Sequence, residues 1–370
     1  MIIFDHGPDG KPACFSGARD LVCAYTPDQV LPALRRAEQA RRSGAWVAGW
    51  VGYAAGLAFE PRLHGLAHPG DQPLLVLGLY DAPGPVPHHT PAPVRLAPLV
   101  PRISRADYGT AFARLQAYIA AGDCYQVNLT FPLDTRLLSG TARDLAVALA
   151  GLQPVGFGAF ADMGVGPVIV SRSPELFFAV RADGLMETRP MKGTAPRHPD
   201  PAQDAAAARD LADSQKNRAE NLMIVDLLRN DMARLAQPGS VRVPDLFAVE
   251  SYATVHQMTS RITAQLVDDP DLATLMAALF PCGSITGAPK IRAMQIIAEL
   301  EPHPRGVYCG TLGWMGPDGT AAFSVAIRTL SLHGDDITLN VGGGIVSDST
   351  ADSEWEEALW KARYITPLTV

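Results

Sequence analysis

Seven prolines fall within the twenty residues from Ala82 to Pro101. Proline has no amide hydrogen to donate and its ring fixes one backbone angle, so this segment is expected neither to pair as a strand nor to continue as a helix. It is therefore predicted to be a connector, 82–103, between a short N-terminal section, 1–81, that is integrated with the main fold, and a larger part, 104–370.

The spacing of apolar residues predicts strands that occur in groups rather than in strict alternation with helices. Grouped strands separated by helices favour an α+β fold with large sheets. Helices are predicted at 32–43, 104–121, 204–235, 272–279, 289–300 and 353–364, and strands at 45–53, 74–80, 125–133, 156–161, 167–172, 176–181, 184–188, 306–315, 321–332 and 336–341.

Composition and charge exclude several classes of protein. The chain has 38 acidic and 31 basic residues and a formal charge of -7, which argues against a surface for nucleic acid or anionic membranes. Its five cysteines are odd in number and never spaced as CxxC, so neither a disulfide framework nor a zinc site is predicted. No membrane span or leader segment is recognisable, and we expect a soluble cytoplasmic protein.

One predicted helix carries carboxylates in unusual surroundings. Residues 220–228 are apolar on nearly every face of a helix, which predicts burial all round. A buried carboxylate needs a cation, a metal or several donors, so Glu220 and Asp226 would each require a partner. An alternative is ordinary pairing, with Asp226 beside Arg229 and Glu220 beside a basic residue.

A second pair of carboxylates lies near the C-terminus. Glu354 and Glu357 are three residues apart and leave the same face of a helix. Because no His or Cys stands at ligand spacing, the two acidic helices favour a partly hydrated Mg²⁺ over Zn²⁺. The alternative is a solvated face on which Glu357 pairs with Lys361.

Three further segments carry groups that could bind an anion or take part in catalysis. Gly342, Gly343 and Gly344 follow a predicted strand and would let backbone amides approach an anion, although a simple turn is the alternative. Ser284 and Thr286 precede a helix whose N-terminus could also hold an anion, and capping is the alternative there. Lys192, between an apolar residue and glycine, would be a nucleophile or base if desolvated, and an ordinary exposed lysine otherwise.

Together these segments resemble the chorismate-utilising enzymes, most closely those of the aminodeoxychorismate branch. The resemblance runs from 104 to 362 and rests on SRSPELFF, ETRPMKGTAPR, RAENLMIVDLLRND, SITGAPKIRAMQII and GGGIVSDS, in this order. It implies an α+β fold in which two large packed β-sheets form a sandwich flanked by helices, in α/β/β/α layers. It makes 104–370 a chorismate-binding catalytic domain.

The resemblance also implies roles for individual residues. Mg²⁺ would be held by Glu220 and Glu357, with Glu354 close by, whereas Asn217 departs from relatives that carry an acid there. Glu175 would protonate the departing ring hydroxyl, Lys192 would be the nucleophile, and His256 would lie near the reacting face of the ring. The substrate-binding residues would be Gln126, Thr194, Ser284, Thr286, Tyr308, Arg328, Gly342, Gly343, Gly344 and Lys361.

Two positions select among the branches of the family. Isochorismate and salicylate synthases carry a lysine base where this chain has Gln126, and glutamine cannot take a proton from water. Anthranilate synthases read PIAGT where this chain has a lysine, Lys192. The implied activity is the synthase subunit of aminodeoxychorismate synthase, a transaminase-type amination of chorismate to 4-amino-4-deoxychorismate for p-aminobenzoate and folate biosynthesis.

No cysteine lies in a glutaminase nucleophile turn, so ammonia is expected from a glutamine amidotransferase partner subunit. Two alternatives remain: anthranilate synthase component I, and a non-catalytic homologue that binds chorismate. The N-terminal section matches the family mainly in 49–53 and shows no convincing tryptophan-binding segment.

Overall fold

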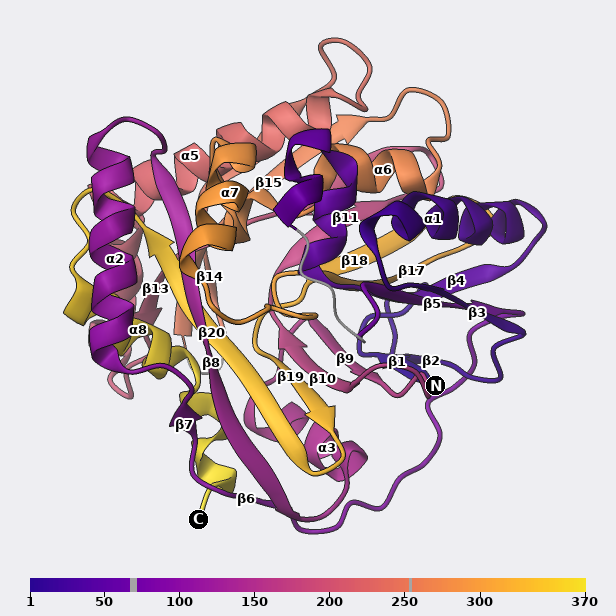
Figure 1. Cartoon of the computed structure of the whole chain (residues 1–370), viewed down its shortest axis with the longest axis horizontal. Helices are drawn as coiled ribbons and strands as arrows, with labels where there is room; N and C mark the ends of the chain where they lie inside the picture. The colour runs from indigo at the N-terminus through magenta and orange to yellow at the C-terminus, as the bar shows by residue number, and fades with distance from the viewer. Residues whose placement is uncertain (67–71, 253–254) are drawn as a thin grey trace.

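The computed structural model describes residues 1–66, 72–252 and 255–370. Its core is two ten-stranded sheets in which every strand pairing is antiparallel (Figure 1). The first sheet has the order β16 (Gly287–Ala288), β8 (Gln126–Ser139), β20 (Asp336–Ile345), β19 (Thr329–His333), β10 (Val168–Ser173), β9 (Phe157–Ala161), β1 (Ile2–Phe4) and β2 (Ala13–Phe15), with β6 (Arg95–Leu96) and β7 (Val100–Pro101) also on β8.

The second sheet carries the remaining strands. Its order is β13 (Met191–Pro196), β15 (Val255–Gln265), β12 (Leu185–Arg189), β11 (Leu176–Val180), β18 (Ala321–Val325), β17 (Thr311–Met315), β4 (Trp46–Val51), β5 (Leu75–Tyr80) and β3 (Asp20–Ala24), with β14 (Arg242–Ser251) pairing with β15.

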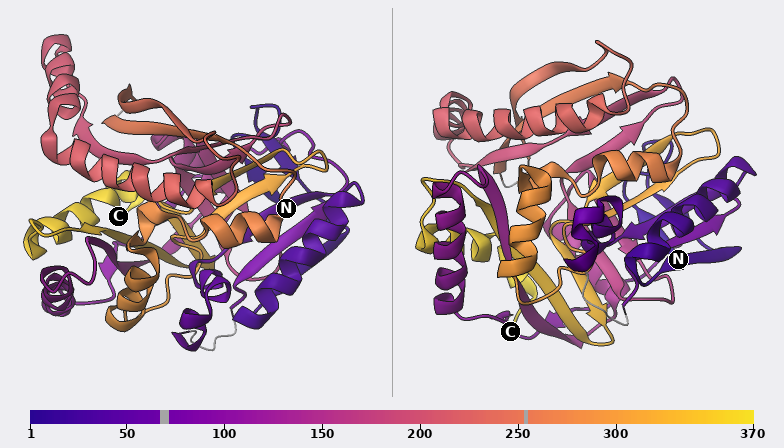
Figure 2. Two further views of the ribbon diagram at one scale, coloured as in Figure 1. Left: turned by 90° about the horizontal axis from the view of Figure 1, so that it is seen from above. Right: turned by 45° about the horizontal axis from the view of Figure 1, so that its top comes forward.

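The helices contact the two sheets in separate groups, as the views in Figure 2 show. The group on the first sheet is α2 (Arg105–Ala120), α3 (Ala142–Leu152), α7 (Lys290–Leu300) and α8 (Ala351–Lys361). The group on the second is α1 (Pro27–Arg42), α4 (Pro201–Asp213) and α5 (Gln215–Ala233), with α6 (Leu272–Leu279) packed on α1 and α5. The predicted α+β sandwich flanked by helices is therefore confirmed.

The connector departs from the prediction that it cannot pair. Its two-residue strands β6 and β7 both pair with β8. β7 contains Pro101, but the residues that follow these two strands are not prolines: the amides of Ala97 and Arg102 donate to the carbonyls of Arg136 and Pro132. Prolines exclude a long strand but leave room for such edge pairings.

Several predicted elements have different limits. The helix predicted at 204–235 is two helices, because Ser214 is extended and caps α5 by accepting a hydrogen bond from the Asn217 amide. The strand predicted at 321–332 breaks at Arg328, which has a positive φ of 50°. The long β14–β15 hairpin was not predicted at all.

The prediction that 220–228 is buried all round is wrong. Leu222 is 44% exposed, and Asp226 lies at the surface in an ion pair of 2.8 Å with Arg229. Only the face formed by Asn221, Ile224, Val225 and Leu228 is buried. Nor do the three glycines form a turn, because they lie within β20, paired to β8.

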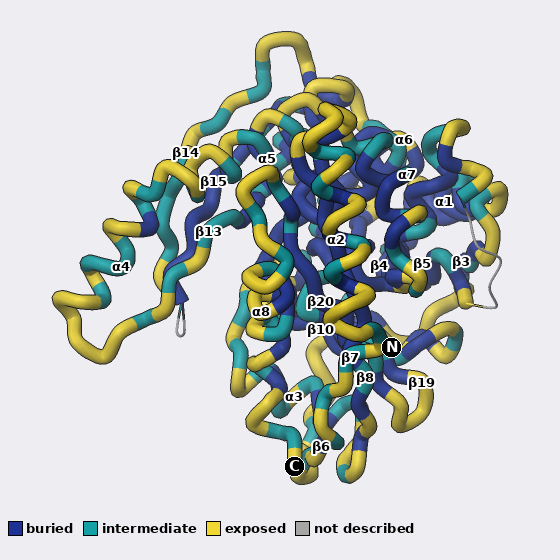
Figure 3. Tube along the Cα trace, turned by 60° about the vertical axis from the view of Figure 1, so that its left-hand side comes forward, coloured by how far each residue is buried: buried dark blue, intermediate teal, exposed yellow. Residues whose placement is uncertain are grey.

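Figure 3 shows that α4 and the adjoining ends of β13, β14 and β15 extend from the body of the molecule. Within α4 only Leu211 is buried. In the described residues, no helix is long and apolar enough to cross a membrane.

An aromatic cluster fixes α8 to the first sheet. The ring of Trp355 stacks on Phe131 of β8, with centroids 4.5 Å apart and planes 9° apart. Tyr108 of α2 meets both rings edge-on, at 5.3 and 5.5 Å. The orientation of α8, and with it of Glu354 and Glu357, therefore depends on buried aromatic contact.

We predict that Trp355→Ala lowers the free energy of unfolding by about 3–5 kcal/mol, because it leaves a cavity among buried rings. Trp360→Ala on the same helix should change it by less than about 1 kcal/mol, since Trp360 is 43% exposed. Urea denaturation of both variants measures the difference. Equal losses would show that the cluster does not anchor α8.

Candidate active site

A cavity of about 550 Å³ lies between the two sheets. Its walls come from β8, β20 and α8 on one side and from β13, β15 and α5 on the other. Most of the residues predicted for the site lie in these walls: Glu175, Lys192, Thr194, Glu220, Ser284, Tyr308, Arg328, Gly342, Gly343, Gly344, Glu354, Glu357 and Lys361.

Three predicted residues are not in the cavity wall. The Thr286 hydroxyl donates to the carbonyls of Cys282, at 3.0 Å, and Gly283, at 3.3 Å, so it braces its own loop. Gln126 is fully buried just behind the wall, and neither atom of its side-chain amide has a partner. His256 is the third.

The position of His256 corrects its predicted place beside the substrate. Its Nδ1 lies 2.8 Å from the Ser251 hydroxyl and its Nε2 lies 2.9 Å from Asp204 of α4. Successive residues of a strand face opposite sides, so the next residue, Gln257, lines the cavity instead. No strand was predicted here, so the sequence could not show which of these two residues is turned inward.

Glu175 stands between β10 and β11, where its amide donates to the Ser173 hydroxyl at 3.2 Å. Its side chain is buried and accepts a hydrogen bond of 2.7 Å from the Ser284 hydroxyl. Burial raises the pKa of Glu175 to about 7, against the opposing effects of that hydrogen bond and of the charges on Lys192 and Arg328. A carboxyl group with this pKa is suited to acid catalysis at neutral pH.

Lys192 owes its orientation to an irregularity in β13. The pairing of β13 with β15 shifts register between Met191 and Thr194, and Gly193 within the shift has a φ of +91°. Such a bulge redirects a side chain that a regular strand would hold elsewhere. Burial lowers the pKa of Lys192, helped by the nearby Lys361, while Glu220, Glu357 and Glu175 oppose the shift.

The glycines of β20 leave space that polar groups occupy. A Cβ atom on Gly344 would lie 2.8 Å from the Gln126 Nε2 and 2.9 Å from the Lys192 Nζ. One on Gly343 would lie 2.9 Å from a carboxylate oxygen of Glu354. Any side chain at either position would displace these groups, so the glycines permit a close approach rather than a turn.

The three glutamates form an acidic cluster that spans the cavity, with Glu220 on α5 at one side and Glu354 and Glu357 on α8 at the other. Glu354 accepts a hydrogen bond of 2.6 Å from Ser349, and burial, together with the charge of Glu357, raises its pKa. Burial would also raise the pKa of Glu357, but Lys361 at 2.9 Å outweighs it and the net shift is downward. Glu220 lies 4.0 Å from Lys216.

This donor set has the chemistry of a hydrated hard-cation site. All three carboxylates face one cavity, and the carboxylates of Glu354 and Glu357 converge on the space above Gly343. Among the described residues, however, no three His, Cys, Asp or Glu side chains are grouped closely enough to enclose an ion. The arrangement fits Mg²⁺, which binds through one or two carboxylates and retains water ligands.

Arg328 and Tyr308 add a positive group and a polar group to the cavity wall. Arg328 occupies the break between β18 and β19, and burial lowers its pKa while the charges of Tyr364 and Glu175 oppose this shift. Tyr308 is buried in the wall nearby, and burial raises its pKa well above the usual value. A φ of +50° at Arg328 marks local strain of the kind found at functional sites.

Several cavity-lining residues were not predicted. They are polar or aromatic residues on elements whose inward face the sequence pattern did not reveal: Asn128, Lys216, Asn217, Gln257, Asn340 and Trp360. Asn217 lies in the wall, but its side-chain amide donates to Ser214 at 3.0 Å.

Comparison with known proteins agrees with this geometry. The chorismate binding enzyme family matches residues 14–367. The chain belongs to this family. Aminodeoxychorismate synthase component 1 of Klebsiella aerogenes is 47% identical to it over 263 residues, which cover 71% of the chain and 58% of that relative.

Anthranilate synthase component 1 of Streptomyces coelicolor is 41% identical over 262 residues, 70% of the chain and 51% of that relative. The chain thus spans under three fifths of the length of these two chorismate binding enzymes. The crystal structure of anthranilate synthase component I from Streptococcus pneumoniae superposes with a TM-score of 0.75 at 26% identity, covering 87% of this chain and 80% of that one.

We predict that Glu175→Gln is more stable than wild type at pH 8, and that this advantage is larger at pH 8 than at pH 5. Between its unfolded pKa, 4.5, and its folded pKa, about 7, the folded state retains a proton that the unfolded state has lost, so wild-type stability falls as pH rises. The gain should be on the order of 3 kcal/mol. Urea denaturation at both pH values measures it, and a pH-independent difference would contradict a raised pKa.

Proposed function

We propose that the protein is the synthase subunit of an aminodeoxychorismate synthase, which aminates chorismate at ring carbon 4. The observation that carries this proposal is the shared cavity of Lys192 and Glu175, an amine and a carboxyl group whose pKa values burial shifts in opposite directions. Both groups are thereby biased toward their neutral forms, as a nucleophile and an acid require. The similarity to aminodeoxychorismate synthase component 1 supports the same assignment.

The first half of the reaction replaces the ring hydroxyl by lysine. The Lys192 Nζ forms a bond to ring carbon 2, both ring double bonds shift, and the bond between carbon 4 and its oxygen breaks. Glu175 gives its proton to that oxygen, which leaves as water. Splitting one difficult substitution into two steps is the usual gain of covalent catalysis.

The second half reverses the path with ammonia. Ammonia attacks carbon 4, the double bonds shift back, and the bond between carbon 2 and Lys192 breaks to return the free amine. The proton lost by the new amino group returns to Glu175. The products are 4-amino-4-deoxychorismate, with its enolpyruvyl group retained, and water, so the sum of the two halves balances.

Other groups of the chain would hold the substrate. Chorismate carries two carboxylates, and the guanidinium of Arg328 with the hydroxyl of Tyr308 offers donors for the enolpyruvyl carboxylate. Gln126 replaces a group able to activate water, which leaves ammonia as the nucleophile. A glutamine amidotransferase subunit would supply that ammonia.

Mg²⁺ would be bound by Glu220 of α5 together with Glu354 and Glu357 of α8. When bound, it would withdraw electrons through the ring carboxylate of the substrate. Lys361 and Lys216 pair with these acids in the structure and balance part of their charge.

Anthranilate synthase component I is the second candidate, because relatives with that name are also similar. It would release pyruvate and form anthranilate. Lys192 favours the first assignment, since the anthranilate branch has PIAGT where this chain has PMKGT. A non-catalytic chorismate-binding homologue is a third reading, and chorismate-induced thermal stabilisation without turnover would support it.

We expect wild type with chorismate, Mg²⁺ and ammonium to yield aminodeoxychorismate, identified by mass spectrometry or as p-aminobenzoate after adding the lyase. Lys192→Ala should reduce turnover by about 10³-fold or more, since it removes the nucleophile. Lys11→Ala, at an exposed lysine, is the control. Anthranilate as the main product would exclude the assignment, and full activity in Lys192→Ala would exclude the covalent step.

We predict that Glu357→Gln weakens Mg²⁺ binding about tenfold or more, measured without substrate by titration calorimetry, because it removes one charged ligand. Glu356→Gln is the matched control, since Glu356 neighbours it in sequence but faces solvent and pairs with Arg105. Equal affinity in the two variants would remove Glu357 from the metal site.

A further inference from the structure

Arg305 is a buried arginine behind the wall of the cavity, and no role in the site or the proposed reaction has been given to it above. It is 5% exposed and forms a two-pronged ion pair with Glu301, at 2.8 and 2.7 Å. Its remaining donors reach two backbone carbonyls, those of Ile285 at 3.0 Å and Asn128 at 2.9 Å. A fixed fork of this kind holds its acceptors in one relative position.

Both carbonyls belong to residues of the cavity wall. Ile285 directly follows Ser284, whose hydroxyl donates to the carboxyl group of Glu175. Asn128 belongs to β8, and its amide in turn donates to the Thr286 carbonyl at 2.8 Å. Arg305 therefore clamps the loop that carries Ser284 against β8.

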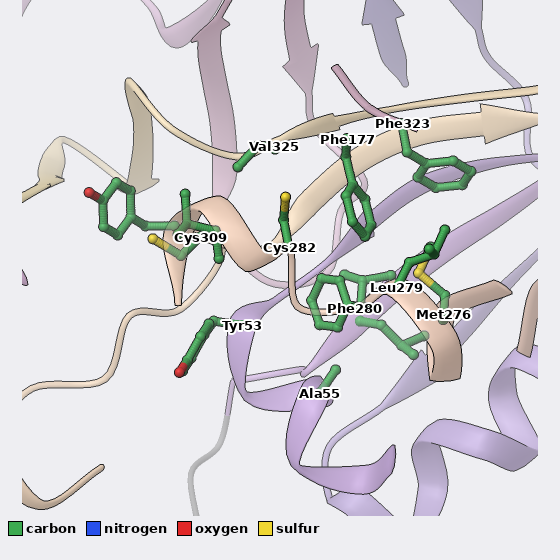
Figure 4. Close-up of a cluster of buried hydrophobic side chains, with 14 of the residues drawn as sticks. Tyr53, Ala55, Phe177, Met276, Leu279, Phe280, Cys282, Cys309, Phe323 and Val325 are labelled. Carbon is green, nitrogen blue, oxygen red and sulfur yellow. The ribbon is translucent and has the colours of Figure 1, made fainter. Parts of the chain in front are cut away.

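The same residue begins the turn that carries Tyr308, whose amide donates to the Arg305 carbonyl at 3.1 Å. On its other side, the guanidinium lies 4.5 Å from the ring centroid of Tyr53, in the N-terminal section. Tyr53 borders the hydrophobic cluster drawn in Figure 4 with Cys282 and Cys309. Glu301 is held as well, because it accepts hydrogen bonds from the amide and the hydroxyl of Thr130.

We propose that Arg305 is a positioning residue for the amination, which sets the orientation of Ser284 toward Glu175 by fixing the loop between α6 and α7 against β8. The inference rests on the proposed function for its kinetic consequences. Arg305 does not touch the cavity itself, so its effect passes through the backbone carbonyls that it holds. Loss of the clamp weakens the hydrogen bond that keeps the pKa of Glu175 from rising further.

Arg41 provides a matched control. It is 2% exposed, forms a two-pronged ion pair with Glu38, and donates to the carbonyls of Gly316 and Pro317. None of these partners lines the cavity. Arg305→Lys and Arg41→Lys thus remove the same kind of buried fork, one next to the site and one away from it.

We expect Arg305→Lys to lower kcat with ammonium by about 10- to 100-fold. A general acid acts in its protonated form, so activity falls as pH rises through its pKa, and a weaker Ser284 bond should move this decline to higher pH. Arg41→Lys should lose comparable thermal stability yet keep the wild-type kcat and pH profile. Hydrogen exchange should rise at the amides of 283–286 in Arg305→Lys alone.

Wild-type kcat and pH profile in Arg305→Lys would overturn the proposal, as would equal changes in the two variants. If Arg305→Lys fails to fold, Glu301→Gln with Glu38→Gln as control applies the same comparison with a milder change. The exchange measurement needs no turnover, so it shows whether Arg305 holds the loop of Ser284 even if wild type fails to aminate chorismate. That failure would count against the proposed function alone.

Discussion

The arrangement of the site depends on one steric constraint, the close approach of side chains from α8 and β13 to the glycine run of β20. With hydrogen in place of a side chain at Gly343 and Gly344, the carboxylate of Glu354 and the amine of Lys192 come within contact distance of the strand. They arrive from opposite sides of the cavity, one on α8 and the other on β13. The carboxylates of α8 and the Lys192 amine can share one space only because β20 carries no side chain at Gly343 and Gly344.

Burial then acts on the groups brought together. Low local polarity disfavours charge, so it raises the pKa of Glu175 and lowers that of Lys192. Their mutual attraction opposes both shifts. The chain's net charge of -7 describes its whole composition, whereas the cavity wall also carries the basic side chains of Lys192, Arg328 and Lys361. These local positive groups would let an acidic chain bind an anionic ligand.

Most of the predicted site residues line the cavity, because long ordered motifs report a fold that local spacing does not. It failed where the outcome depended on the direction of a side chain. His256 and Gln257 are neighbours in β15, a strand that was not predicted, and only its packing against α4 decides which of them faces the cavity. One face of α5 is turned to solvent and is not covered by another described element. Asp226 lies on that face and is exposed, although the apolar pattern around it predicted burial.

The breaks in regular structure were also beyond local spacing. The strand predicted at 321–332 shows no glycine or proline at Arg328, yet the backbone there takes a positive φ because the preceding and following strands belong to different sheets. The bulge at Gly193 could be inferred from the glycine itself, but not its effect on Lys192. These two irregularities lie at Arg328 and next to Lys192, and at such positions the intrinsic preferences of residues are the weakest guide.

The N-terminal section is part of both sheets that enclose this site, even though a proline-rich connector separates it in sequence. Its strand β4 pairs with β17, and β1 pairs with β9, so it contributes to both sheets. Removing it would expose unpaired strand edges on each. Tyr53 adds a more direct link, since its ring covers the guanidinium of Arg305 and its amide donates to the Gly306 carbonyl. Any displacement of the N-terminal section is therefore transmitted to the turn that carries Tyr308 and to the loop of Ser284.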